Sequence, residues 1–150
     1  MRIQATEQEL LVQEIAALGT VLRNPETRAR YADLRAAIEA GDVPDELLGH
    51  LGNVLELGLQ SGRLRKLYGA DGEQALAHVF RRTPPGASLS EAASEVTKAL
   101  SGIRGQTVED ITVSALGPGS YGVTIDTDRC QLTMRLDRAG VRIENVAIGL

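Results

Sequence analysis

Residues 123–137, VTIDTDRCQLTMRLD, place apolar and polar side chains on alternate positions, interrupted only around Asp128-Arg129. A period of two puts successive side chains on opposite faces of a β-strand, so this stretch predicts two half-buried strands joined by a tight turn. We expect one sheet face to be apolar and the other polar. The polar face would carry Thr124, Asp126, Gln131, Thr133, Arg135, Arg142 and Glu144.

The same alternation continues on both sides of this stretch. It predicts four strands, at Val108–Leu116, Tyr121–Thr127, Cys130–Asp137 and Val141–Ile148. The phase of the last strand changes after Ile143, which indicates a β-bulge near Asn145. Before the strands, Ser88 with Glu91 is typical of a helix start, and an apolar stripe follows at Leu89, Ala92, Val96, Leu100 and Ile103. We therefore expect a helix packed on a four-stranded antiparallel sheet.

Residues 1–83 are predicted to be helical. Thr6 with Glu9 resembles a capping box, and Asn24-Pro25 combines a good N-cap with proline at the first helical position. The leucine-rich segment 45–61 contains three glycines, Gly49, Gly52 and Gly58. Glycine is costly inside a helix, so this segment is either two shorter helices or one helix that crosses a neighbour closely.

The proline pair in Thr83-Pro-Pro-Gly86 predicts a break between these two regions. The expected organisation is a helical region of four to five helices at 1–83, a Pro/Gly hinge at 84–87 and an αββββ unit at 88–150. These are either separate modules or parts of one composite domain. The fold class is α+β in both cases.

The composition excludes several classes of protein. Lys and Arg number 10 against 12 Asp and Glu in residues 1–87, and 6 against 8 in residues 88–150, so neither part is basic. One cysteine excludes an internal disulfide and a cysteine-based zinc site. No apolar run is long enough for a membrane span, and acids near the N-terminus argue against a secretory signal. We expect a cytoplasmic protein, and the preference for Arg over Lys suggests a bacterial one.

Motifs for catalysis or cofactor binding are weak in this chain. Gly117-Pro-Gly-Ser-Tyr-Gly122 matches GxGxxG, but a strand follows it where a dinucleotide site needs a helix, so we interpret it as a hairpin turn. The two histidines, His50 and His78, form no metal-binding motif and have no nucleophile at a recognised spacing. We predict no metal and no cofactor, and a non-enzymatic role is favoured over an enzymatic one.

A local excess of positive charge lies between residues 63 and 82. This stretch suggests a binding surface for an anionic ligand, which would use Arg63, Arg65, Lys66, Tyr68, Arg81 and Arg82. Its location suggests a cleft between the two halves of the chain. The alternative is that these cations lie at helix C-termini, where they are favoured without any ligand. The same stretch could serve a nucleic acid, although the net charge makes that partner less favoured.

These observations favour a protein-interaction or self-associating module, with a protein partner or a second copy in a homodimer and no membrane. The candidate interface residues lie on the leucine-rich helix and on the polar sheet face. They are Gly49, His50, Gly52, Arg135, Arg142 and Glu144. A binder of small anionic molecules, or an enzyme acting on them, is the first alternative, and a nucleic-acid-binding module is the second.

Overall fold

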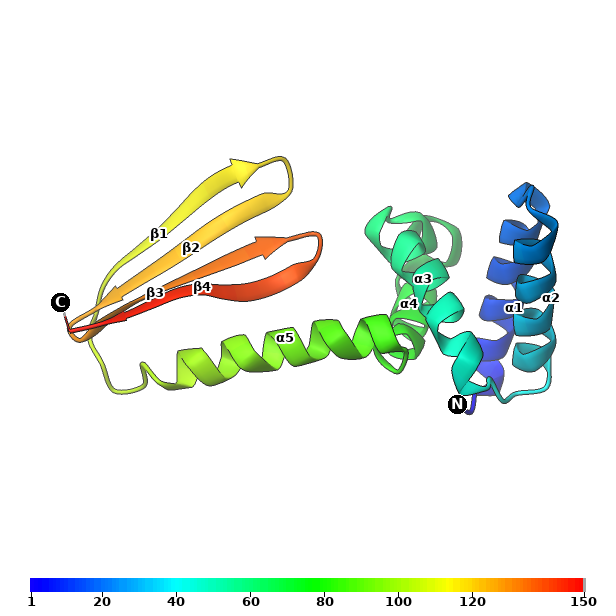
Figure 1. The fold of residues 1–150 in the computed structure, drawn as a ribbon, viewed down its shortest axis with the longest axis horizontal. Coiled ribbons are helices and arrows are strands. Elements are labelled where there is room, and N and C mark those ends of the chain that lie inside the picture. Colours follow the sequence, from blue (N-terminus) through cyan, green and yellow to red (C-terminus); the bar gives the residue numbers. More distant parts are fainter. Residues whose placement is uncertain (150) are drawn as a thin grey trace. The chain divides into compact units, whose positions relative to one another are not determined.

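A computed structural model describes residues 1–149 and has an α+β fold, with helices followed by a four-stranded antiparallel sheet (Figure 1). The fold class predicted from the sequence is therefore confirmed. The elements are α1 (Ala5–Val21), α2 (Pro25–Glu39), α3 (Asp45–Gln60), α4 (Arg63–Arg81), α5 (Pro84–Ser101), β1 (Val108–Gly117), β2 (Ser120–Thr127), β3 (Cys130–Asp137) and β4 (Gly140–Ile148).

The chain divides into two compact units, Met1–Ala87 and Ser88–Leu150. The boundary falls inside α5, so the first turn of this helix belongs to the first unit and the remainder to the second. Residues 84–87 are helical, because Pro84 and Pro85 occupy the first positions of a helix, where proline is tolerated. The prediction that Ser88 starts this helix is wrong, and a hinge at 84–87 stays a prediction.

The first unit packs four helices and the start of α5 around an aliphatic core. Its fully buried side chains include Leu11, Leu34, Ile38, Leu51, Leu55, Leu64 and Leu76. Asn24 caps α2 as predicted, since its Oδ1 accepts N–H groups of Glu26 and Thr27 at 2.9 and 3.2 Å. The capping box predicted at Thr6 and Glu9 is wrong, because α1 begins earlier, and the Gln4 N–H donates to the Glu7 carboxylate at 3.0 Å.

The glycines of α3 mark a close approach of other elements. A Cβ added at Gly52 would lie 2.7 Å from Pro85 Cδ, and one at Gly58 would lie 2.7 Å from Leu64 Cγ. Helix α3 is continuous from Asp45 to Gln60, so of the two alternatives the close crossing is correct. In α4 it is Gly69, with φ 72° and ψ −174°, that interrupts the helical path.

In the second unit, the strands pair in the order β1-β2-β3-β4, close to the bounds expected from the sequence. Gly117 pairs with Ser120, so the glycine motif is a hairpin turn, as predicted. Thr133 lies opposite Asn145 and Met134 opposite Ile143, which leaves Glu144 as the extra residue of the predicted bulge. The core of this unit consists of Val96 from α5 packed on Leu132 and Met134.

Candidate functional site

The apolar face of the sheet is only partly covered by α5. Ala99 and Leu100 of α5 extend the core, together with Val123, Ile125, Val141 and Ile143 of β2 and β4. Strand β1 contributes no side chain to this cluster, and every one of its residues is exposed. One helix, about 10–12 Å across, spans little more than two strands spaced about 4.8 Å apart, so a four-stranded sheet extends beyond it.

The register places the apolar side chains of β1 on the same face as the covered core. Ile111 lies opposite Ile125, Val113 opposite Val123, and Val108 opposite Thr127. Their exposed fractions are 57% for Ile111, 65% for Val113 and 50% for Val108, and Tyr121 beside them is 48% exposed. We call Val108, Ile111, Val113 and Tyr121 the β1 patch. This patch extends the hydrophobic face of the sheet beyond the area that α5 covers, and it is exposed to solvent.

Strand β1 is also an edge of the sheet, and most of its length lacks the features that prevent an edge strand from pairing with another strand. Residues 110–115 pair with β2 without interruption, and the irregularities of register lie only at the two ends of the strand. The other edge strand, β4, has a bulge in its middle and carries Arg142 and Glu144. Charges and bulges are the usual features that protect an edge strand. In β1 the two charged residues, Glu109 and Asp110, and the irregularity beside them lie at the start of the strand, so residues 111–115 form the more accessible edge.

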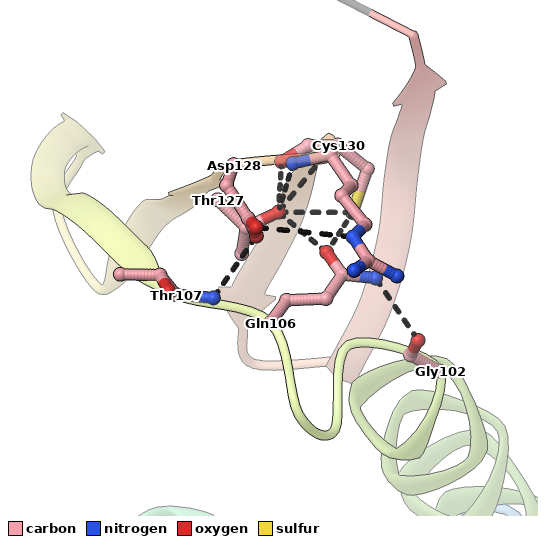
Figure 2. Close-up of polar contacts among 7 residues, drawn as sticks. Gly102, Gln106, Thr107, Thr127, Asp128 and Cys130 are labelled. Carbon is pink, nitrogen blue, oxygen red and sulfur yellow. Dashed lines mark hydrogen bonds and ion pairs between the residues drawn. The ribbon is translucent and has the colours of Figure 1, made fainter.

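A polar cluster centred on the buried Thr127 and Cys130 lies at the end of the sheet at which β1 begins (Figure 2). Thr127 Oγ1 accepts the Cys130 N–H at 2.9 Å and lies 2.6 Å from Gln106 Oε1, in the loop after α5. The Thr107 N–H donates to Asp128 Oδ1 at 2.9 Å, and the Asp128 N–H donates to the Thr107 carbonyl at 3.0 Å. Cys130 is 6% exposed. This cluster holds the C-terminal end of α5 and the start of β1 at one end of the unit.

The polar sheet face carries an internal network of ion pairs. Arg142 Nη2 lies 2.9 Å from Asp137, and Arg135 lies 3.4 Å from Asp137 and 3.6 Å from Glu144. Arg142 donates a hydrogen bond to Asp137, as does the Ala139 N–H, and these contacts hold the pKa of the Asp137 carboxyl below its usual value. The charges of Arg135, Arg142 and Glu144 thus have partners inside the unit. Their role in an interface stays a prediction.

The basic residues predicted to bind a ligand fall into separate clusters in the first unit. Arg63 forms an ion pair with the fully buried Glu14, whose carboxylate also accepts the Tyr68 hydroxyl at 2.9 Å. Arg82 Nη2 donates to Glu7 at 2.8 Å. Arg65 lies 3.6 Å from Glu73, while Lys66 and Arg81 are exposed. The ligand-binding role of these six residues stays a prediction, but three of the five cations among them have acidic partners.

Glu7 and Glu14 are buried carboxylates that were not among the residues predicted to be functional. Burial would by itself raise the pKa of Glu7, but hydrogen bonds from the Gln4 N–H, His78 and Arg82 outweigh it and the pKa lies below its usual value. His78 Nδ1 lies 2.9 Å from Glu7 Oε1. In the sequence, Glu7 and Glu14 alternate with Leu11 and Leu18 at helical spacing, so they lie on the apolar face of α1. This placement was the sequence feature that could have predicted their burial.

The predicted interface residues on α3 have different surroundings. Pro85 and Thr83 occupy the space beside Gly52 in which a Cβ would lie, whereas a Cβ at Gly49 would meet nothing within 4 Å. The ring of His50 packs edge-on against Tyr31, with centroids 5.9 Å apart. The contact at Gly52 is internal to the first unit. An interface role for Gly49, His50 and Gly52 stays a prediction.

A second apolar surface lies inside the first unit. A groove of about 630 Å³ is lined by residues of α1, α2 and α3, among them Leu18, Val21 and Leu57, and by Arg63 of α4. Val21 is 69% exposed and Leu57 68%. The volume lies within the range of small-molecule sites. The lining of this groove combines one of the predicted ligand-binding cations with large apolar side chains.

The part of the chain from residue 1 to 149 brings together no group of three or more His, Cys, Asp or Glu side chains suited to a metal ion. None of the helices in that range has the length and hydrophobicity needed to cross a bilayer. No family model, curated protein or solved structure matches the chain. A candidate site can therefore be inferred only from the geometry within each of the two units.

Proposed function

We propose that this chain is a non-enzymatic protein-interaction module whose docking surface is the β1 patch. The observation that supports this function is the half-exposed apolar row at Val108, Ile111 and Val113, which is continuous with a buried core. An exposed apolar patch that is contiguous with the core is a common feature of protein–protein interaction sites. From the composition, we further propose that the protein is bacterial and cytoplasmic.

Photo-cross-linking from the β1 patch tests this function. A photoreactive phenylalanine analogue at Val113 should give a defined protein adduct, because this side chain points into the proposed contact. The matched positions are Thr124, on the opposite face of the same sheet, and Leu67, which is 58% exposed on α4. Adducts of equal yield at all three positions, or none at Val113, would contradict the proposal.

A second candidate function is the binding of an elongated apolar molecule with an anionic end in the groove of the first unit. The observation that favours it is a mainly apolar groove whose lining includes Arg63, a cation that remains half-exposed beside its partner Glu14. Saturation with a medium-chain fatty acid at 100 times its dissociation constant should stabilise the protein by about 2.7 kcal/mol. Thermal unfolding with and without the acid measures this effect, and a Leu57→Asp variant should abolish it. An unchanged melting temperature contradicts this function.

A further inference from the structure

We propose that the occupant of the β1 patch is the β1 patch of a second copy, so that two sheets pack face to face about a two-fold axis parallel to the strands. This inference rests on the proposed function and adds the identity of the partner. A two-fold dimer brings the same surface together from both copies, so that surface must complement itself in shape and charge. The second unit satisfies this requirement in three respects.

The first respect is the space beside α5. Helix α5 covers the sheet at β2, β3 and β4 and leaves β1 bare. Packed sheets lie about 10 Å apart, which is close to the diameter of a helix, so a second sheet fits in the same layer as α5. The sheet of one copy would then lie beside the helix of the other in each layer. The rows of Val108, Ile111 and Val113 from the two copies would meet at the centre.

The second respect is the accessible edge of the sheet. In this arrangement α5 of the partner lies alongside β1, where it covers the strand that has no neighbour on its outer side. A helix placed over an edge is one of the ways in which proteins prevent uncontrolled strand pairing. The same contact that buries the apolar row therefore also protects the edge.

The third respect is charge. Lys98 lies in the last turn of α5 and Arg104 follows it, while Glu109 and Asp110 lie at the start of β1. The cluster around Gln106 and Thr127 holds these two segments at the same end of the unit (Figure 2). Within residues 1–149 no ion pair involves any of these four charges. A two-fold axis along the strands brings the basic end of one α5 beside the acidic start of the other β1.

Sedimentation equilibrium of the full chain across the micromolar range tests this arrangement. The unmodified chain should show a monomer–dimer equilibrium, and Val113→Arg should raise its dissociation constant by at least about tenfold. Leu67→Arg is the matched control, because it places the same cation at a similarly exposed apolar position outside the patch. Circular dichroism should show the same helix and strand content in all three proteins.

Charge reversal then separates face-to-face packing from other dimers. Glu109→Lys and Lys98→Glu should each weaken the dimer, and the combined variant should recover most of the loss. If Val113→Arg dissociates the dimer and the combined variant recovers nothing, face-to-face packing is overturned in favour of pairing between β1 edges. If the chain is a monomer at every concentration, the second copy is overturned. In that case an adduct at Val113 with a different protein would still support the proposed function.

Discussion

Glu7 and Glu14 lie two turns apart on the same face of α1, and both carboxylates are buried in the helical unit. Each one meets polar side chains of α4 or of the residue that follows it, since His78 and Arg82 contact Glu7, and Arg63 and Tyr68 contact Glu14. A buried carboxylate needs such partners to offset its loss of hydration. The two acids therefore fix how α4 is placed against α1.

The stability of the first unit should depend on pH through Glu7. The folded-state pKa of Glu7 is lowered, so its stabilising contribution is present above the unfolded-state value of about 4.3 and is lost as the pH falls through the lower folded-state value. Glu7→Gln should reduce the free energy of unfolding at pH 7, and the difference should shrink below about pH 4. Urea unfolding at several pH values measures it. Glu9→Gln, on the exposed side of α1, is the control.

The ion pair between Arg63 and Glu14 should matter more than the pair between Arg65 and Glu73. Arg63→Ala leaves a fully buried carboxylate with only the Tyr68 hydroxyl, at a cost of about 2 kcal/mol. Arg65→Ala breaks a 3.6 Å pair between more exposed side chains and should cost less than about 1 kcal/mol. Chemical unfolding of both variants tests the order, and equal losses would contradict the burial of Glu14.

Two glycines of α3 should respond to alanine in opposite directions. At Gly52 the new methyl group would lie 2.7 Å from Pro85 Cδ and 2.8 Å from Thr83 Oγ1, so we expect a loss of about 1–3 kcal/mol. At Gly49 it would meet no atom within 4 Å, and the higher helix propensity of alanine should add up to about 1 kcal/mol. Differential scanning calorimetry of the two variants gives the sign of each change in stability. A stabilising Gly52→Ala would show that α3 does not pack closely on the start of α5.

Among the threonines of the second unit, Thr127 should be the one whose substitution reduces stability most. Thr127→Val removes the hydroxyl that accepts the Cys130 N–H and contacts Gln106, at an expected cost of about 1–3 kcal/mol. Thr112→Val removes an exposed hydroxyl that contacts only Asp110 and should change stability by less than about 0.5 kcal/mol. Hydrogen exchange of the β2 and β3 amides reports the difference. Unchanged protection in Thr127→Val would contradict a structural role for this cluster.

The sheet could be predicted from the sequence because alternation is a local property of a strand. The bounds of β3 and the bulge at Glu144 both follow from which positions are apolar. The start of α5 could not be predicted in the same way, because Pro84-Pro85 is equally compatible with a break and with a first helical turn. Tertiary packing decides between the two, since Pro85 lies against Gly52 of α3.

The candidate site was harder to predict than the fold. Ile111 and Val113 have the same alternation as Ile125 and Val123, and only the position of α5 makes the first pair exposed and the second pair part of the core. Glu7 and Glu14 resemble surface glutamates until α4 supplies their partners. In both cases the decisive information is which element covers a face, and a periodic pattern does not contain it.

The bulge at Glu144 keeps both halves of β4 on the same apolar face of the sheet. Because one extra residue lies between Ile143 and Asn145, Val146 and Ile148 return to the face of Leu132 and Cys130. Deleting Glu144 would remove the bulge and leave a regular strand in which Val141, Ile143, Val146 and Ile148 alternate with polar or small residues and stay on one face. Over evolutionary time this position should therefore accept many substitutions and also tolerate the loss of its one extra residue.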